Sequence, residues 1–262
     1  MADDLPYDVP DEIQVTADGP LRIVTLNRPD DLNATNHVLH QGLAELWPQV
    51  DADTGARAVV LTGAGRAFSA GGDFGYIDEL TQDLELRKLT LVHGRQIVTG
   101  MIGCRVPIVA AVNGPAVGLG CSLVALSDIA FMAESAHLAD PHVLMGLVAA
   151  DGGPITWPRM TSLMLAKEYA LTGERIPAER AAAIGLVNHV VPDDEVLDAA
   201  LACAHRIAKL PPGAVEDTKR VINLHLERAV LATLDYALTA EHRSFDSPEL
   251  RANLDRVLHK DA

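Results

Sequence analysis

Short apolar runs separated by turn residues dominate the first half of the chain. Two of these runs flank Asp18-Gly19-Pro20, and an Asp-Gly turn in this position is typical of a β-hairpin. The run at 106–112 has no polar position, which favours a strand that is covered on both faces. The pattern predicts a sheet with strands at residues 13–15, 21–26, 58–62, 106–112 and 129–132.

Helical spacing of apolar residues connects these strands and then takes over. Asn36 has the position of an N-cap, because apolar residues follow it at helical spacing as far as Val50. One short strand, at 186–190, interrupts the helices of the second half. Strands that alternate with helices, followed by a helical segment, predict an α/β fold with a helical C-terminal layer. The further predicted helices are 84–102, 121–126, 161–172, 177–184, 193–210 and the chain from 215 onward.

Composition limits the kind of protein. With 262 residues, of which 48% are hydrophobic, the chain can bury a sizeable core in one large domain or in a core with a helical appendage. Its net charge of −15 disfavours nucleic-acid binding, because phosphate contacts need clustered Lys and Arg, and the sequence holds no such cluster.

Cysteine usage, the N-terminal residues and the length of the apolar runs indicate where in the cell the protein is located. Cys104, Cys121 and Cys203 are odd in number and far apart, which is unlike a disulfide framework or a zinc site and fits a reducing compartment. The N-terminal residues lack the positive charge and apolar run of a secretory signal. The apolar stretch at 117–126 is too short to span a bilayer. We therefore expect a cytoplasmic protein without a membrane or nucleic-acid partner.

Two loops rich in small residues are the strongest functional signals. The first, residues 67–73, follows a predicted strand and precedes a helix, so its N–H groups lie at the carboxyl end of a strand, where ligands often bind. Asp73 has the position of a helix cap. A tight turn that binds no ligand is the alternative for this loop.

The second loop, residues 113–121, also joins an apolar strand to a helix. Its N–H groups lie at the positive end of a helix dipole, and Leu119 stands between Gly118 and Gly120. The loop lacks the third glycine of a dinucleotide fingerprint, since that position is Leu123, and no Gly-Lys-Ser/Thr follows as in a P-loop. Two such loops can offer two N–H donors to one oxygen, which is an oxyanion hole.

Motifs spread along the chain resemble the crotonase (enoyl-CoA hydratase/isomerase) superfamily. The resemblance covers about residues 12–245. It rests on Leu26-Asn27-Arg28-Pro29 with Asn33-Ala34, Ala67-Phe68-x-Ala70-Gly71-x-Asp73, residues 106–114 followed by Gly118-x-Gly120-Cys121, Ser127-Asp128-Ile129-Ala130, residues 171–176, and Gly185-Leu186-Val187.

The resemblance implies a fold, an assembly and a substrate. The fold would be a ββα spiral core over residues 12–200, preceded by a loose N-terminal arm at 1–11. Residues 201–262 would form a helical trimerisation region, giving a homotrimer or a hexamer made of two trimers. The substrate would be an acyl-CoA, with no permanently bound cofactor and with CoA as part of the substrate. The implied oxyanion-hole amides are those of Gly72 and Leu119, and the implied CoA-binding residues are Arg28, Asp31, Leu32, Ala70, Gly72, Asp73 and Phe74.

The catalytic acids depart from the family pattern. Hydratases of this family carry two glutamates, and the matching positions here are Ser122 and His142. Asp151 lies where several branches of the family place an aspartate, in an apolar stretch where burial would raise its pKa and suit acid–base work. We expect catalysis by Asp151, with His142 as a second proton-transfer group and Ser122 as a polar lining residue.

Other roles for these residues remain open. Asp151 also has the position of an N-cap for a helix at 155–160. A nucleophilic serine lacks the Gly-x-Ser-x-Gly elbow. His137, Asp140 and His142 resemble a metal cluster in composition only, so we expect no metal site. Tyr236 is a candidate pocket residue from the C-terminal layer.

With one expected acid, double-bond migration is as compatible with the sequence as water addition. The same oxyanion also supports thioester hydrolysis, decarboxylation or ring closure. The two missing glutamates leave a third possibility, an oligomer that binds acyl-CoA without chemistry.

Overall fold

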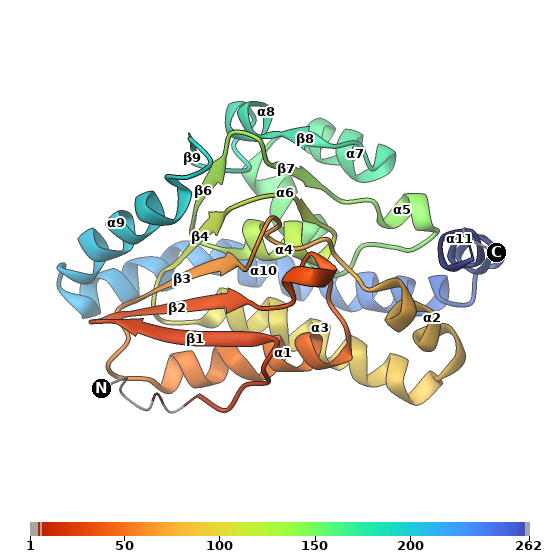
Figure 1. Cartoon of the computed structure of the whole chain (residues 1–262), viewed down its shortest axis with the longest axis horizontal. Helices are drawn as coiled ribbons and strands as arrows, with labels where there is room; N and C mark the ends of the chain where they lie inside the picture. The colour runs from red at the N-terminus through yellow and green to blue at the C-terminus, as the bar shows by residue number, and fades with distance from the viewer. Residues whose placement is uncertain (1–4, 6, 260–262) are drawn as a thin grey trace.

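The computed structural model describes residue 5 and residues 7–259. Its main sheet has six strands in the order β1 (Ile13–Asp18), β2 (Leu21–Leu26), β3 (Ala58–Gly63), β4 (Ile108–Val112), β6 (Ile129–Ala133) and β9 (His189–Val191). β1 and β2 form the predicted antiparallel hairpin, and all other neighbours are parallel. Helices separate the parallel strands, so the predicted α/β fold is confirmed (Figure 1).

β3 is buried on both faces, which explains why its sequence is apolar. Val59 and Leu61 belong to the main core on one face, whereas Ala58 and Val60 belong to a second cluster on the other. Because successive side chains point to opposite faces, a strand covered on both sides has no position for a polar residue. The main core is covered by α1 (His37–Ala52) and α3 (Leu84–Gly103), and the second cluster by α9 (Val196–Ala208).

A small second sheet includes part of the second small-residue loop. It pairs β5 (Ala116–Val117) with β7 (His137–Ala139), and β7 with β8 (Ile176–Pro177). These strands were not predicted, because two or three residues are too few to show a period of two. The remaining helices are α2 (Phe74–Gln82), α4 (Leu119–Leu126), α5 (His142–Met145), α6 (Gly153–Met160), α7 (Leu163–Thr172), α8 (Ala178–Ala183), α10 (Pro212–Ser244) and α11 (Pro248–Leu258).

Several predicted boundaries move by a few residues. The strand predicted at 186–190 is β9, which starts at His189, because Leu186 instead donates its N–H to Ala181 at the end of α8. The helical tail predicted from 215 is two helices, α10 and α11, separated before Pro248. The described part of the N-terminal arm, residues 5 and 7–11, lies along α1. Tyr7 donates its hydroxyl to Asp53 and Asp8 its N–H to Gln49, while residues 1–4 and 6 lie outside the described residues.

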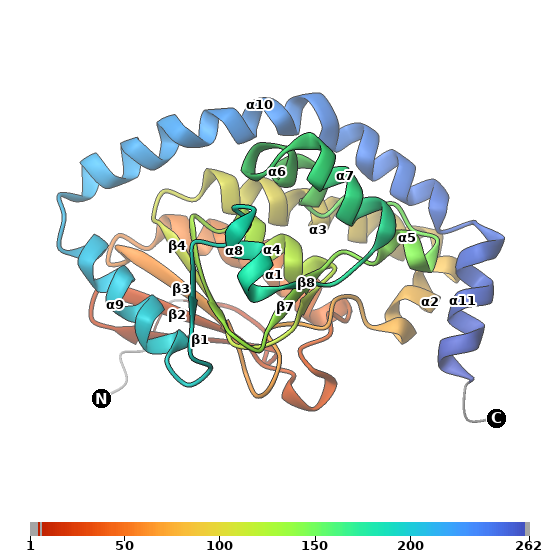
Figure 2. The ribbon, with the colours of Figure 1, turned by 90° about the horizontal axis from the view of Figure 1, so that it is seen from above.

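The C-terminal layer crosses the molecule. Figure 2 shows α10 running along one side, with α11 folding back at its end beside α2. α10 packs against α3 and α6. In the described part of the chain, no helix is both long and apolar enough to serve as a membrane span.

One buried lysine joins α10 to the sheet. The Nζ of Lys219 donates to the carbonyl oxygen of Val106 at 2.8 Å and lies 2.7 Å from a carboxylate oxygen of Asp128. We expect Lys219→Met to lower the free energy of unfolding by about 3 kcal/mol, because removing one partner leaves a half-buried charge uncompensated. Urea denaturation measures this. Arg220→Met, at the exposed neighbouring position, is the control and should change stability by less than about 0.5 kcal/mol. An equal effect of both substitutions would contradict the role of the ion pair.

Candidate active site

The two predicted loops lie against each other. The first connects β3 to α2, and the second connects β4 to α4 through β5. A bridge between Ser69 and Ala116 joins them. Gly71 has a φ of 89°, and a Cβ atom on it would lie 2.9 Å from the carbonyl oxygen of Val117. Only glycine combines this backbone conformation with so close an approach, so the small residues seen in the sequence have a structural cause.

Among the residues of each loop that line a shared cavity, one has a backbone N–H group without an acceptor in the described residues. In the first loop, Ala70, Gly71 and Asp73 donate to Leu32, Ser69 and Thr35, respectively, but within the described residues Gly72 has no acceptor. In the second, Val117 donates to Ser69 and Gly118 to Ala139, while Leu119, the first residue of α4, has none among the described residues. Gly72 and Leu119 both line one cavity. These are the two residues that the sequence indicated.

That cavity has a volume of about 330 Å³ and a mostly apolar wall. Its size is within the range of small-molecule sites. The apolar lining comes from α2, α3, α5, α10 and the segments that follow α5 and α10, and includes Leu80, Leu91, Met145, Leu147, Leu238 and Phe245. A cavity with this lining suits an acyl chain.

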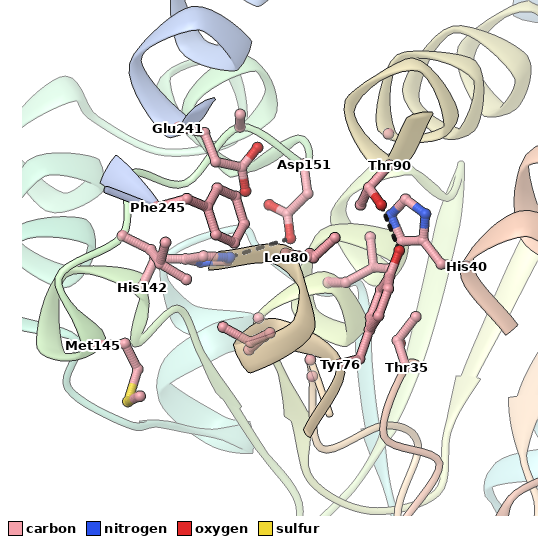
Figure 3. Close-up of a pocket in the computed structure, with 18 of the residues that line it drawn as sticks. Thr35, His40, Tyr76, Leu80, Thr90, His142, Met145, Asp151, Glu241 and Phe245 are labelled. Atoms are coloured by element: carbon pink, nitrogen blue, oxygen red, sulfur yellow. Dashed lines mark hydrogen bonds and ion pairs between the residues drawn. The ribbon is translucent and has the colours of Figure 1, made fainter. Parts of the chain in front are cut away.

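Two of the three predicted catalytic side chains, His142 and Asp151, line the cavity (Figure 3), whereas Ser122, predicted as a lining residue, lies outside the lining and contacts Asp151. Ser122, on α4, donates its hydroxyl to Oδ1 of Asp151 at 2.8 Å. The Nε2 of His142 lies 3.7 Å from Oδ2 of Asp151, and its Nδ1 lies 2.5 Å from Oδ1 of Asp140. Asp151 is not the N-cap of α6, because Gly152 has that position without a side-chain bond. The alternative structural role for Asp151 is therefore wrong.

Burial and charge set the protonation of this group. Burial alone would lower the pKa of His142, but the carboxylates of Asp140 and Asp151 outweigh it and raise that pKa to about 10. Burial raises the pKa of Asp151, and the His142 cation offsets this only in part. Burial also opposes ionisation of Asp140, yet the charge and hydrogen bond of His142 hold its pKa below the usual value. His142 is thus a cation placed between two carboxyl groups.

A further carboxyl group, that of Glu241 on α10, also lines the cavity. Within the described chain, its carboxyl has no hydrogen-bond or ion-pair partner. Burial raises its pKa to about 8, with the nearby carboxylates of Asp151 and Asp140 adding to the shift and His142 opposing it. Sequence reasoning missed Glu241, although the signal was present: Leu238, Glu241 and Phe245 share one helix face, so a carboxyl interrupts an apolar stripe. Tyr236 is 75% exposed and does not line this cavity.

The predicted CoA-binding residues divide into two groups. Ala70, Gly72 and Phe74 line the cavity. Arg28, Asp31, Leu32 and Asp73 lie outside its lining. Arg28 is 2.7 Å from Asp31 and 3.4 Å from Asp73, and Asp73 caps α2 as predicted by accepting from the N–H groups of Gly75 and Tyr76. This second group supports the loop that carries Gly72.

Comparisons with known proteins find relatives that match most of the chain. A family model described as enoyl-CoA hydratase/isomerase matches residues 17–260. The short-chain-enoyl-CoA hydratase of Clostridium acetobutylicum is 33% identical over 229 residues, which are 87% of this chain and 85% of the relative. A crystal structure of an enoyl-CoA hydratase/isomerase from Mycobacterium paratuberculosis superposes with a TM-score of 0.94 at 64% identity, over 95% of this chain and 100% of the other. A monofunctional enoyl CoA isomerase from M. smegmatis superposes with a TM-score of 0.70 at 29% identity, over 82% and 94%.

Proposed function

The chain belongs to the enoyl-CoA hydratase/isomerase family, and from this membership we propose that it adds water reversibly to the double bond of an enoyl-CoA. Membership also confirms the predicted crotonase-like fold. The observation that carries the proposal is one apolar cavity that combines two acceptor-free amides, Gly72 and Leu119, with two carboxyl groups, Asp151 and Glu241. The second carboxyl favours hydration over a double-bond shift, which needs only one acid–base group.

The amides of Gly72 and Leu119 receive the thioester carbonyl oxygen. When water adds at C3, negative charge develops on this oxygen as the enolate forms. Two N–H donors of cavity-lining residues, both without another acceptor in the described chain, would stabilise that charge without reorganisation, and the N-terminal end of α4 adds its dipole. CoA enters as part of the substrate.

The two carboxyl groups have different tasks. Asp151, oriented by Ser122 and stabilised as an anion by His142, takes a proton from water while the water oxygen bonds to C3. The electrons of the double bond move to the thioester oxygen. Glu241, neutral below a pKa of about 8, then gives its proton to C2, which restores the carbonyl and completes the 3-hydroxyacyl product.

The pKa of Glu241 predicts the pH dependence of the reaction. Because its protonated form is the acid, kcat/KM should have a plateau below about pH 8 and fall as pH rises through that value, and it should fall again at low pH, where protonation of Asp151 removes the base. In Glu241→Gln the decrease of kcat/KM near pH 8 should disappear, and its plateau value should be about 10²-fold lower. A pH profile of enoyl-CoA hydration measures both. Any decrease of kcat/KM that remains at higher pH is assigned to His142, whose pKa is about 10. An unchanged limb near pH 8 in the variant would assign the titration to another group.

The decisive test of the proposed function is the loss of the conjugated-thioester absorbance of crotonyl-CoA. Hydration removes the conjugation, and mass analysis should find a product heavier by one water. A 3-enoyl-CoA is tested beside crotonyl-CoA. Migration of its double bond without water addition would identify the activity as isomerisation instead of hydration. Release of free CoA would indicate hydrolysis, and loss of carbon dioxide or ring closure would appear as a change in mass. Tight binding of acyl-CoA without turnover of any of these substrates would contradict an enzymatic role.

We also propose that the chain acts as a homotrimer or as a dimer of trimers in the cytoplasm. Large apolar side chains are exposed on α7 and α10, among them Met164, Leu171, Val221 and Leu231, the last 85% exposed. Exposed apolar groups of this kind are typical of surfaces that another subunit covers. Sedimentation equilibrium tests the assembly, and a stable monomer would contradict it.

A further inference from the structure

The cavity has a second polar group that the proposed mechanism does not use. His40 on α1, Tyr76 on α2 and Thr90 on α3 all line it. Figure 3 shows these three side chains together on one side of the cavity, with Asp151, His142 and Glu241 on the other. A purely hydrocarbon acyl chain would leave His40 without a polar partner, and buried polar groups of proteins are normally hydrogen-bonded.

His40 is the unpartnered member. It is 9% exposed, and its Nδ1 is buried without a hydrogen-bond partner. Burial lowers the pKa of His40 to about 3, and the neighbouring His93 and His37 contribute to the shift, so the ring is neutral at working pH. A neutral imidazole carries one N–H. Buried N–H groups without an acceptor are rare, which favours the tautomer with the proton on Nε2. Nε2 has no partner within the described residues either, so His40 offers a donor to the cavity.

Tyr76 supplies the complementary acceptor. Its hydroxyl lies 2.5 Å from Oγ1 of Thr90, and Thr90 donates its single hydroxyl proton to the carbonyl oxygen of Leu86 at 2.9 Å. Because Thr90 has no second proton, Tyr76 must be the donor of the bond that they share. The phenolic oxygen of Tyr76 then retains only lone pairs. The rings of His40 and Tyr76 are neighbours, with centroids 6.4 Å apart.

We propose that His40 and Tyr76 form a subsite for a hydroxyl group on the acyl chain, so that the preferred substrate is an acyl-CoA thioester hydroxylated away from its thioester end. A hydroxyl both donates and accepts, and it can therefore satisfy the Nε2–H of His40 and the phenolic oxygen of Tyr76 together. A keto oxygen satisfies only His40, and a methyl group satisfies neither. That the thioester lies at Gly72 and Leu119 rests on the proposed function.

Such a subsite determines specificity because it rejects the wrong ligand. Sites that hydrogen-bond a substrate hydroxyl discriminate strongly against the analogue without it, since the polar groups of the site would then be desolvated and unpaired. An apolar pocket, in contrast, discriminates much less strongly between a hydroxyl and a methyl group. A hydroxyl-binding subsite therefore predicts tighter binding of a hydroxylated ligand than of its unsubstituted counterpart, whereas an apolar pocket does not.

Calorimetric binding of saturated acyl-CoAs tests the subsite independently of turnover. Each straight-chain thioester from butanoyl-CoA to decanoyl-CoA is compared with its ω-hydroxy counterpart. At the chain length that reaches the subsite, the hydroxylated ligand should bind the wild-type chain at least about tenfold more tightly. In His40→Phe and in Tyr76→Phe this ratio should fall to about one or below. Tyr236→Phe, at an exposed position outside the cavity, is the matched control and should keep the wild-type ratio.

Equal or weaker binding of every ω-hydroxy ligand to the wild type would overturn the subsite, and so would a preference that survives both substitutions. Two variants are used so that poor folding of one leaves the test intact. The proposed function has a separate readout, the hydration of crotonyl-CoA. A chain that prefers hydroxylated ligands but hydrates no enoyl-CoA would contradict the proposed function and support the subsite.

Discussion

Replacing Asp151 by asparagine is expected to lower kcat/KM for enoyl-CoA hydration by about 10³-fold, which corresponds to about 4 kcal/mol of transition-state stabilisation. The side chain keeps its size and can still accept the hydroxyl of Ser122 through its amide oxygen. What it loses is the ability to take a proton. The effect should therefore appear in kcat, with the affinity for saturated butanoyl-CoA nearly unchanged, as steady-state kinetics and calorimetry can establish.

Ser122→Ala is the matched control for this prediction. It removes the hydrogen bond at 2.8 Å that orients Asp151 but leaves the carboxyl in place, so the expected loss is only about tenfold. A similar loss in both variants would indicate that Ser122 has a chemical role of its own. Turnover by Asp151→Asn at the wild-type rate would exclude Asp151 as the base and leave Glu241 as the candidate.

The loops of the site could be predicted because their signals are local. The apolar run at 106–112 and the glycines that follow it determine where β4 ends and where α4 begins. Gly71 and Gly118 allow the two loops to pack directly on each other, and each glycine directly precedes in sequence the loop residue predicted to supply an oxyanion-hole N–H. Asp151 and His142 were also candidates from sequence, because each matches a position at which members of the resembled family place a catalytic acid.

Contacts between distant segments could not be predicted in the same way. Glu241 reaches the cavity only because α10 packs on α3 and α6, and nothing near residue 241 indicates which helices it meets. His40 and Tyr76 come from different helices, and each reads in sequence as an ordinary helix position. The pairing of His142 with Asp140 needs the turn between β7 and α5, and both elements are too short for periodicity to detect.

The amide of Leu119 can be removed by a single substitution, because Leu119 is the first residue of α4. Proline is well tolerated at this helix position, where its fixed φ fits and the N–H has no helical partner. Gly118 has a φ of 51° and a ψ of −122°, the mirror image of the extended region that residues before proline prefer, and glycine can adopt it. Leu119→Pro should therefore fold, and it should lower kcat by about 10²–10³-fold because one oxyanion donor is lost.

Leu119→Val separates the amide from the side chain. Leu119 is buried in the main core, so either substitution removes apolar contacts, but valine keeps the N–H and is close to proline in size. The valine variant should retain kcat within about tenfold, at a cost in stability of about 1 kcal/mol that thermal unfolding measures. The difference in kcat between the two variants is then the contribution of the amide. Equal kcat values in the two variants would remove Leu119 from the oxyanion hole, and the enolate would have to be stabilised by Gly72 and by the positive end of α4 alone.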